Sequence, residues 1–409
     1  MNSRDLAILE KLEKELSLKE LQIKSLLTIT QAINDNIAAT GLYSMYQNFL
    51  SWDMGIDTMA LFIKDTDLIW ECVSQINFTR GSYKRIVDEL LKFDRLHTVK
   101  EDDSEVLQDF DIIIPVYHKK EPIAYSIIGG IKTREDLYNK IQFITTITNI
   151  IAVAIENKRL FNRKLEQEKL NKEIELARDV QKMLIPERLP KYKHYQLSSI
   201  YKPHSNIGGD YLDYIEFNEH KFAFCIADIS GKGVPAALLM ANFQAMVQSL
   251  IYQYRDLETF VFALNQAVYR ITKSDKFITF FIAQVDMKKK TLTYVNAGHY
   301  PPLLVSRKKV RKLDSGCTVI GAFEKLPEIK EETIKLEEDS LILSFTDGLA
   351  DLRNQSGEFF EDDKIESFAL EHASKDVDSF NEELLKEIDG FKGNTMYVDD
   401  IAILTCKIN

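Results

Sequence analysis

Four carboxylate sites recur at one kind of position along the 409-residue chain, next to an apolar run that is typical of a β-strand. Asp210 ends the segment IGGD, Asp228 ends the apolar run FAFCIAD, and Asp347 follows LILSFT. The pair Asp399 and Asp400 directly precedes IAILTC. A strand that ends in aspartate presents its carboxylate at one rim of a sheet. Strands brought together would therefore gather these groups into a dense negative cluster.

Such a cluster would have a definite chemistry. Carboxylates a few ångströms apart repel one another and stay ionised only when a cation neutralises them. Oxygen ligands without His or Cys suit hard cations such as Mg²⁺ or Mn²⁺. Two such ions about 3.5–4 Å apart can hold a water as hydroxide and clamp a phosphoryl group. The pattern therefore predicts a site for two divalent ions that hydrolyses a phosphate ester.

Turn chemistry is the alternative explanation for each aspartate. Aspartate is common in turns that bind nothing, and Asp347-Gly348 is by itself a hairpin signal. Any one site taken alone is therefore more often structural. The combination is more specific, because Gly208-Gly209 stand beside one site and Gly231 and Gly233 beside another. Glycine lets the backbone approach an ion or a phosphate closely.

The composition excludes several classes of protein. The chain is 45% hydrophobic, 28% charged and 10% aromatic, which are ordinary globular values. A formal net charge of −11 disfavours binding to nucleic acid or an anionic membrane. The four cysteines, which are far apart, suggest neither a zinc site nor a disulfide framework. Without a signal-peptide core or an apolar, charge-free window of about 20 residues, we expect a cytoplasmic protein with no membrane insertion.

Residues 4–36 predict a helix with coiled-coil spacing. Apolar residues fall on the a and d positions of its heptads: Leu9, Leu12, Leu16, Ile23, Leu26 and Ile33. Lys19 and Thr30 interrupt this seam. We expect the helix to pair with a second copy. The alternative is an amphipathic helix packed on the next domain.

Residues 40–135 alternate short apolar runs with turn residues. A helix is expected at Leu42–Trp52, and strands at 59–65, 68–74, 110–118 and 124–132. The pattern predicts an antiparallel sheet with helices at its ends.

A second long helix is expected at 137–185, where neither Gly nor Pro occurs before Pro186. Its weaker seam comprises Leu160, Leu170, Ile174, Ala177 and Leu184, with Gln167 and Gln181 on the same line. A continuous helix is stiff and can carry a rotation or a shift from one domain to the next. A passive spacer is the alternative.

Strands dominate the remainder of the chain, and helices come in blocks. Strand-like runs lie at 222–227, 277–285, 291–296, 302–305, 340–346 and 401–406. Helices are expected at 234–252, 256–273 and about 363–388. This order favours an α+β fold over alternating βαβ units.

These segments resemble a known family. The stretches LARDVQKMLIPERLP, IGGDYLDYIE, FCIADISGKGVPAALLMA, VNAGHYPPLL, LILSFTDGLAD and VDDIAILT resemble the bacterial stage-II-sporulation-type serine phosphatases, within the metal-dependent type 2C protein phosphatase superfamily. The resemblance covers about 175–408, in family order. It implies an αββα sandwich with two Mn²⁺ or Mg²⁺ ions at one edge. It also implies release of phosphate from phosphoserine or phosphothreonine, with a phosphorylated anti-sigma-factor antagonist as the usual partner.

The resemblance also assigns roles by motif. Asp228 resembles the carboxylate that bridges the two metals, and the backbone carbonyl of Ile229 would be a neighbouring ligand. Asp210 resembles the ligand of the second metal. Asp347 and Asp399 resemble ligands of the first. Asp400 stands beside that last ligand and is expected to support it.

One departure concerns proton transfer. Eukaryotic relatives carry a histidine, the candidate general acid, where this chain has Ser230, which is a poor acid. His299, in NAGHYPP, titrates near neutrality when unperturbed, but a histidine in a turn is more often structural. Lys232 could bind phosphate as a point charge, although a solvated turn lysine is the more common case.

Residues 40–160 resemble the GAF sensor family. The match is to the last strands, DIIIPVYHKKEPIAYSIIGGIK, and the exit helix, IIAVAIENKRLFN. The cyclic-nucleotide signature of that family and a Cys-His pair for a bilin are missing, and Cys72 is expected in the core. The ligand could be a small molecule, a partner protein, or nothing.

Together these features predict a sensor-regulated protein serine/threonine phosphatase in which metal-held hydroxide attacks phosphorus without a phosphoenzyme. The alternative is a phosphatase-like scaffold with weak or no catalysis that binds a partner protein. The expected organisation is a coiled-coil helix at 1–38, a GAF-like domain at 39–160 with its exit helix from 137, a helical linker at 161–186 and the phosphatase domain at 187–409. We expect a homodimer through the two long helices.

Overall fold

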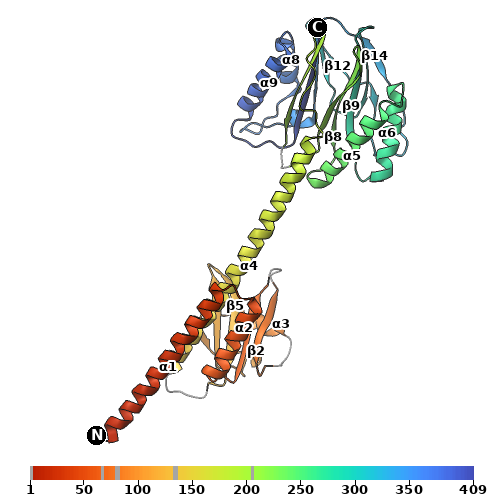
Figure 1. Ribbon diagram of the computed structural model, residues 1–409. Helices are drawn as coiled ribbons and strands as arrows, with labels where there is room; N and C mark the ends of the chain where they lie inside the picture. The colour runs from red at the N-terminus through yellow and green to blue at the C-terminus, as the bar shows by residue number, and fades with distance from the viewer. Residues whose placement is uncertain (1–2, 66–68, 79–82, 132–136, 204–206) are drawn as a thin grey trace. The chain divides into compact units, whose positions relative to one another are not determined.

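The protein divides into two compact units, Met1–Glu168 and Lys169–Asn409, in a computed structural model that describes residues 3–65, 69–78, 83–131, 137–203 and 207–409. Each unit has its own strands and helices (Figure 1). Each also has its own apolar core.

Unit 1 is built on an antiparallel sheet of five described strands in the order β2-β1-β5-β4-β3. The strands are β1 (Thr58–Lys64), β2 (Trp70–Ile76), β3 (His97–Thr98), β4 (Ile112–His118) and β5 (Glu121–Gly129). The helices are α1 (Ser3–Asn34), α2 (Ala39–Asn48), η1 (Phe49–Asp53), α3 (Tyr83–Leu90) and η2 (Glu105–Leu107). The start of α4 (Leu137–Lys182) also belongs to this unit.

Side chains on β1 show how this sheet is packed. Met59 and Leu61 belong to the core shared with α1, α2 and α4, while Ala60 and Phe62 belong to the core shared with α3. Successive side chains of a strand point to opposite faces, so both faces of the sheet are covered. The predicted antiparallel sheet with helices is therefore present, although α3 and the short β3 were not predicted. The predicted strand ends at Leu68 and Lys132 lie outside the described residues.

The predicted long helix is α4, which contains 46 residues. After Lys182 the backbone hydrogen bonds join residues three positions apart instead of four. Met183 N donates to Val180 O, and Leu184 N donates to Gln181 O. Such bonds often close a helix end. Among the described helices, none is both long and apolar enough to span a membrane.

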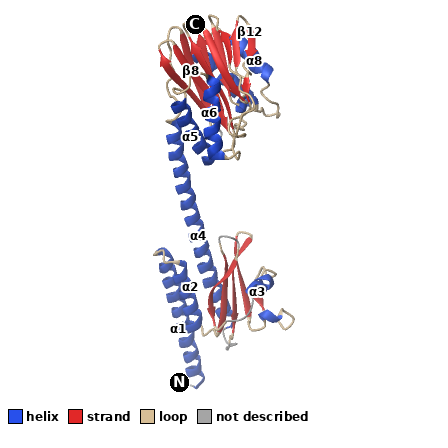
Figure 2. Cartoon of the chain, turned by 90° about the vertical axis from the view of Figure 1, so that its right-hand side faces the viewer, coloured by secondary structure: helices blue, strands red, loops and turns tan. Residues whose placement is uncertain are grey.

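Unit 2 contains two sheets packed face to face with helices outside them (Figure 2). The six-stranded sheet has the order β13-β10-β9-β8-β7, with β14 paired to β10. Its strands are β7 (Tyr211–Asn218), β8 (Lys221–Ile229), β9 (Ile278–Asp286), β10 (Thr291–Ala297), β13 (Gly316–Cys317) and β14 (Glu332–Lys335). The five-stranded sheet has the order β12-β11-β15-β16-β6. Its strands are β6 (Tyr195–Lys202), β11 (Leu303–Ser306), β12 (Lys309–Lys312), β15 (Ser340–Phe345) and β16 (Ile401–Ile408).

Three apolar layers hold this unit together. Helices α5 (Val234–Leu250) and α6 (Leu257–Thr272) pack on the outer face of the six-stranded sheet. Helices α8 (Asp362–His372) and α9 (Val377–Lys392) pack on the five-stranded sheet, next to the short α7 (Asp347–Ala350). The layer between the sheets includes Phe222, Phe224, Phe281 and Leu404. The result is an α+β fold, as the order of the elements predicted, with the αββα layers that the resemblance implied.

One prediction for this unit was wrong, and five strands were not predicted: β6, β7, β12, β13 and β14. The single helix expected at 363–388 is two helices, because Asp376 caps α9 by accepting hydrogen bonds from Asp378 N and Ser379 N. Strands β6 and β7 were missed because their polar residues hide the pattern of a strand. The β6 sequence YQLSSIYK, for example, buries only alternate or scattered positions.

Candidate functional site

The four predicted aspartates lie at strand ends of both sheets. Asp210 directly precedes β7, and Asp228 is the second-last residue of β8. Asp347 opens α7 just after β15, and Asp399 stands two residues before β16. Each sheet therefore contributes two carboxylates. We call Asp210, Asp228, Asp347 and Asp399 the aspartate cluster.

The electrostatics show that these carboxylates are close enough to repel one another. The pKa of Asp228 is raised to about 7, first by burial and then by the charges of Asp347, Asp399 and Asp400. Burial also raises the pKa of Asp210 well above its usual value, with Asp228 as the next cause. The pKa of Asp347 is raised by burial and then by Asp399. The cluster therefore carries negative charge that its own surroundings neutralise only in part.

A hydrogen bond fixes the deepest carboxylate of the cluster. Asp210 is 2% exposed, and its Oδ2 accepts from Thr346 Oγ1 at 2.8 Å. Thr346 is itself held by β16, because its Oγ1 accepts from Ala402 N at 3.0 Å. Thr346 was not predicted as a site residue, although its place between LILSF and Asp347 was a usable signal.

Glycine allows the backbone to approach the cluster closely. A Cβ on Gly208 would lie 2.7 Å from Asp400 Oδ2, which accepts a hydrogen bond from Gly209 N at 2.7 Å. A Cβ on Gly348 would lie 1.9 Å from the Asp400 carbonyl oxygen. Larger residues would displace Asp400 and, with it, the neighbouring Asp399. The predicted supporting position of Asp400 is consistent with these contacts.

Lysine lies at the exposed side of the cluster. Lys232 Nζ is 2.9 Å from Asp399 Oδ2 and also donates to the Val398 carbonyl at 3.2 Å. The Lys232 side chain is 59% exposed, so the pair is solvated and weak. A Cβ on Gly231 would lie 3.0 Å from Lys276 Nζ, which places a second lysine beside the same turn.

A cavity of about 340 Å³ opens beside the cluster. Asp228 and Asp347 line it together with Thr279, His299, Tyr300 and neighbouring residues. Burial lowers the pKa of His299 to about 4. This histidine is therefore neutral near pH 7, which does not favour it as a general acid. Ser230 Oγ accepts from Phe277 N at 2.9 Å and so has a structural contact.

The donor set suits a hard divalent cation in its chemistry. It comprises carboxylates and the Ile229 carbonyl, whose oxygen would lie 3.0 Å from a Cβ on Gly209. Within the described residues, no group of three or more His, Cys, Asp or Glu side chains is arranged to hold a metal ion by itself. Mg²⁺ commonly takes only one or two carboxylates and keeps several waters, so a closed cage is not required.

Two further side chains reach this site and were not predicted to do so. Gln181, near the end of α4, donates through Nε2 to the Gly208 carbonyl at 2.6 Å, and its Oε1 accepts from Gly208 N at 3.2 Å. Tyr201 Oη donates to the Asp210 carbonyl at 3.4 Å. The sequence signal for Gln181 was its polar character on a mostly apolar seam, a feature that it shares with Gln167.

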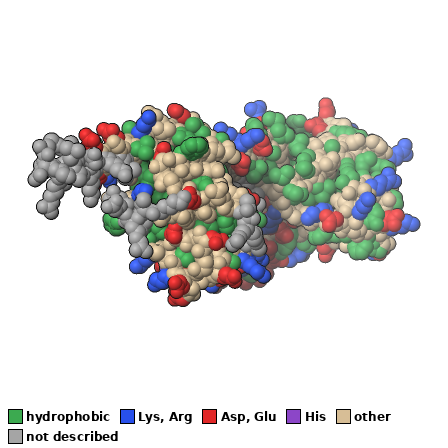
Figure 3. Space-filling view, turned by 90° about the horizontal axis from the view of Figure 1, so that it is seen from below, with side chains coloured by type: hydrophobic (Ala, Val, Ile, Leu, Met, Phe, Trp, Pro, Cys, Tyr) green, Lys and Arg blue, Asp and Glu red, His purple; other side chains and the backbone are tan. Residues whose placement is uncertain are grey.

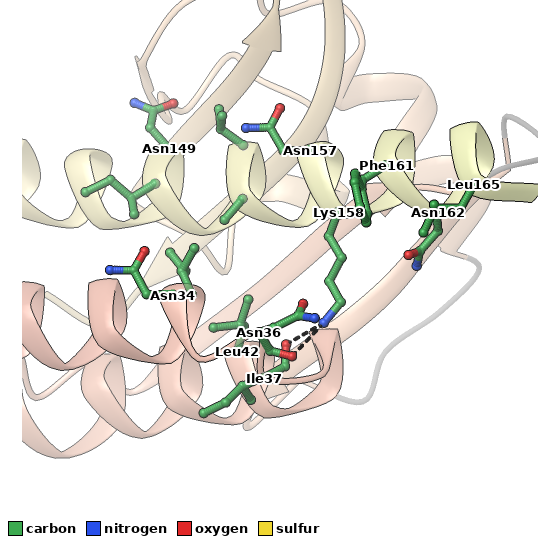
Figure 4. Close-up of a pocket in the computed structure, with 14 residues that line it drawn as sticks. Asn34, Asn36, Ile37, Leu42, Asn149, Asn157, Lys158, Phe161, Asn162 and Leu165 are labelled. Carbon is green, nitrogen blue, oxygen red and sulfur yellow. Dashed lines mark hydrogen bonds between the residues drawn. The ribbon is translucent and has the colours of Figure 1, made fainter. Parts of the chain in front are cut away.

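A larger groove lies in unit 1 and contains none of the aspartates. Its volume is about 1070 Å³, and α1, α2 and α4 contribute its lining (Figure 4). The apolar part includes Ile33, Ile37, Leu42, Val153, Phe161 and Leu165. Lys158 Nζ closes one side by donating to the carbonyls of Asn36 and Ile37, at 3.0 and 2.9 Å. The groove is therefore a separate feature of the N-terminal unit.

Comparison with known proteins shows what unit 2 is similar to. Residues 218–409 match the family described as "Stage II sporulation protein E (SpoIIE)". The phosphoserine phosphatase RsbU of Bacillus subtilis is 29% identical over 262 residues, which are 62% of this chain and 76% of RsbU. The phosphoserine phosphatase RsbP of the same organism is 29% identical over 193 residues, 46% of this chain and 47% of RsbP.

A solved structure supports the fold. The SiaA PP2C domain of Pseudomonas aeruginosa superposes with a TM-score of 0.54 at 20% sequence identity, covering 60% of this chain and 99% of that domain. The sandwich fold of unit 2, the family match and the two relatives all point to the same kind of protein, a serine phosphatase. Residues 218–409 therefore match the SpoIIE-type serine phosphatases, and the fold of unit 2 is similar to that of a PP2C domain.

Proposed function

We propose that this chain releases phosphate from phosphoserine or phosphothreonine of a partner protein, such as an anti-sigma-factor antagonist, under control of its N-terminal unit. The observation that carries the proposal is the aspartate cluster, in which two sheets each contribute two carboxylates to one acidic site. RsbU and RsbP, whose names state a phosphoserine phosphatase, support the substrate class.

The residues proposed to hold Mn²⁺ or Mg²⁺ are the aspartate cluster and the Ile229 carbonyl, with Asp400 supporting Asp399. Bound divalent ions would neutralise the cluster and make the phosphorus of the substrate more electrophilic. Asp210 and Asp228 are held in a buried, low-dielectric environment, where charge interactions are stronger than in water. Thr346 and Gly209 keep Asp210 and Asp400 in fixed orientations.

In the proposed reaction, water attacks phosphorus directly and the serine or threonine oxygen leaves, so no phosphoenzyme forms. His299 is buried and neutral, and we propose that solvent protonates the leaving oxygen instead. Lys232 and Lys276 stand at the rim, where they would attract a phosphorylated segment. Acidic and basic side chains both occur on the face drawn in Figure 3. The formal net charge of −11 disfavours a polyanionic substrate and so favours a protein partner.

Regulation is proposed to reach the site through the end of α4. The Gln181 side chain makes hydrogen bonds with both the backbone N–H and the backbone carbonyl of Gly208, two residues before Asp210. A rotation or shift of the helix would move this clamp and thereby the Asp210 loop. The segment 175–186 is therefore the proposed switch between active and inactive arrangements. The GAF-like sensor, its ligand and the default state of the switch remain part of this hypothesis.

A homodimer through the long helices is also proposed. Leu12, Leu16 and Ile23 of the predicted seam are 59%, 63% and 59% exposed on α1. Leu26 and Ile33 pack against the core of unit 1 instead. The N-terminal part of the seam is thus available to a second copy, whereas the C-terminal part is used within the chain. The side chain of Leu9 lies outside the described residues.

The direct test is phosphate release from candidate phosphoserine proteins by the full-length chain, with and without Mn²⁺. The proposal expects release that depends on Mn²⁺. A catalytically inactive scaffold would bind such a protein without releasing phosphate, and would show neither activity nor a thermal shift with Mn²⁺. Removal of residues 1–160 should change the activity or the oligomeric state if the N-terminal unit regulates the enzyme.

A further inference from the structure

The most informative side chain outside the aspartate cluster is His299, in the loop that follows β10. The residue is 4% exposed, and its backbone N donates to Asn296 Oδ1 at 2.8 Å. The imidazole Nδ1 lies 2.9 Å from Thr279 Oγ1. The Nε2 atom is also buried and makes no hydrogen bond of normal geometry within the described residues. A buried ring with this arrangement needs an explanation, because buried polar atoms are normally paired.

Thr279 connects His299 to one member of the cluster. It lies on β9 directly opposite Asp228 on β8, in an antiparallel register. Side chains of such opposite residues lie on the same face of a sheet, with Cβ atoms about 4.5–5.5 Å apart. Thr279 and Asp228 also line the same 340 Å³ cavity. The Thr279 hydroxyl is therefore placed between the imidazole and the Asp228 side of the cavity.

Phe345 connects His299 to the other sheet. It is the last residue of β15, two positions before Asp347, and its ring packs 5.0 Å from that of Tyr300, the neighbour of His299. Its carbonyl is the neighbouring group that favours a proton on His299, opposing the larger effect of burial on the His299 pKa. The imidazole is therefore located between strand β9 of one sheet and the end of β15 in the other.

We infer that His299 is a positioning residue, whose neutral imidazole braces Thr279 against the end of β15 and so sets Asp228 and Asp347 at the separation that divalent cations require. The tautomer that satisfies both neighbours carries its proton on Nε2, facing the Phe345 carbonyl. Nδ1 then accepts the proton of the Thr279 hydroxyl. This inference rests on the proposed function, because it presumes that the cluster binds metal.

The same contacts argue against a role as general acid, and a measurement of metal affinity separates the inference from a purely structural role. A general acid must present a proton to the leaving oxygen, whereas Nδ1 is occupied by Thr279 and both ring nitrogens are shielded from solvent. A purely structural histidine would stabilise the fold without affecting the affinity for metal. Partners that orient metal ligands from behind typically alter affinity or activity by about 10–100-fold when they are removed.

The test is the affinity of the full-length chain for Mn²⁺ alone, measured by isothermal titration calorimetry. His299→Ala and the isosteric Thr279→Val should each weaken Mn²⁺ binding about tenfold or more. The double variant should be no weaker than the weaker single variant, because the two residues act as one unit. With p-nitrophenyl phosphate as substrate, kcat should fall in these variants while KM stays near the wild-type value.

Conservative variants separate the two contacts of the ring. His299→Asn places an amide oxygen near the Nδ1 position and should restore part of the Mn²⁺ affinity through Thr279. His299→Gln places an amide nitrogen near Nε2 and should keep only the contact with Phe345. The wild-type imidazole should show the ¹⁵N signature of a neutral ring protonated at Nε2, and Thr279→Val should shift only its Nδ1 signal. His372→Ala is the matched control, because that ring stacks on Phe368 in α8 and faces no cluster residue.

The outcomes distinguish this inference from the proposed function. Wild-type protein that binds no Mn²⁺ would refute the metal site itself. If wild-type binds Mn²⁺ and both His299→Asn and Thr279→Val match its affinity, the brace is refuted and the phosphatase proposal stands. If His299→Ala does not fold, the isosteric Thr279→Val variant decides the question.

Discussion

Thr346 Oγ1 donates a hydrogen bond to Asp210 Oδ2 at 2.8 Å, and this bond links the two sheets of unit 2 inside the aspartate cluster. Thr346 follows β15 in the five-stranded sheet, whereas Asp210 precedes β7 in the six-stranded sheet. Burial favours the protonated form of Asp210 by raising its pKa. The hydrogen bond from the Thr346 hydroxyl opposes this effect by lowering the pKa of Asp210. The site therefore depends on the docking of one sheet against the other.

Replacement of Thr346 by valine should lower stability and metal affinity together. The change leaves a buried carboxylate without its donor, which costs about 1–3 kcal/mol of unfolding free energy. It should also raise the pKa of Asp210 further and so weaken Mn²⁺ binding at neutral pH. Chemical denaturation and Mn²⁺ titration measure the two effects. Thr346→Ser keeps the hydroxyl and should restore the affinity; a serine variant as impaired as the valine variant would contradict this role.

The stability of the metal-free protein should fall as the pH rises from about 4 to about 7. The pKa of Asp228 is about 7 in the folded chain, compared with about 3.9 in an unfolded one. Between these values the folded state holds a proton that the unfolded state has lost, so rising pH favours unfolding. Denaturation in the presence of a chelator measures this dependence. Asp228→Asn should flatten the slope in this window, and an unchanged slope would show that Asp228 is not the group responsible.

The Gln181 clamp predicts a loss of activity without a loss of fold. Gln181→Ala removes both bonds to Gly208, so the Asp210 loop should lose its fixed position. We expect phosphatase activity to fall by about tenfold, as for other supporting partners of a metal site. Gln167→Ala is the matched control, because Gln167 is an exposed glutamine on the same helix. Equal effects of the two substitutions would point to a general property of α4 rather than to the clamp.

Charge placed on the exposed α1 seam should change the oligomeric state. The double variant Leu12→Asp/Leu16→Asp places carboxylates at two positions that are exposed in unit 1. Light scattering on the full chain should show a dimer for the wild type and a monomer for this variant, because apolar a and d residues drive pairing. Glu13→Ala, at an exposed position between them, should leave the dimer intact. A wild-type monomer would refute the proposed pairing.

Most strands of unit 2 could be predicted from sequence because they are continuous apolar runs. Strand β8 contains FAFCIA and is buried along nearly its full length, which gives an unambiguous signal. Strand β7 was missed because Asp213 lies within it. That carboxylate accepts from Tyr211 Oη and Gln248 Nε2, both at 2.6 Å, and is only 5% exposed. A buried polar residue satisfied by distant partners cannot be distinguished from a loop residue by periodicity.

The aspartates of the site could be predicted because each one adjoins a strand or a glycine turn. The residues that orient them could not, since Thr346, Thr279 and Gln181 owe their roles to neighbours that are 136, 20 and 27 positions away in the chain. The sequence also could not predict which residues of the α1 seam pack within unit 1 and which stay exposed. Leu26 and Ile33 follow the same heptad as Leu12, yet they are partly buried and pack against the core of unit 1.

Phosphate release by Asp228→Asn, measured over a range of Mn²⁺ concentrations, tests the central claim most directly. Asp228 is expected to serve both cations, so the variant should release no phosphate at any Mn²⁺ concentration while keeping a native circular dichroism spectrum. Its thermal shift with Mn²⁺ should also be lost. Release at the wild-type rate by a variant that lacks this carboxylate would contradict the assignment of the site.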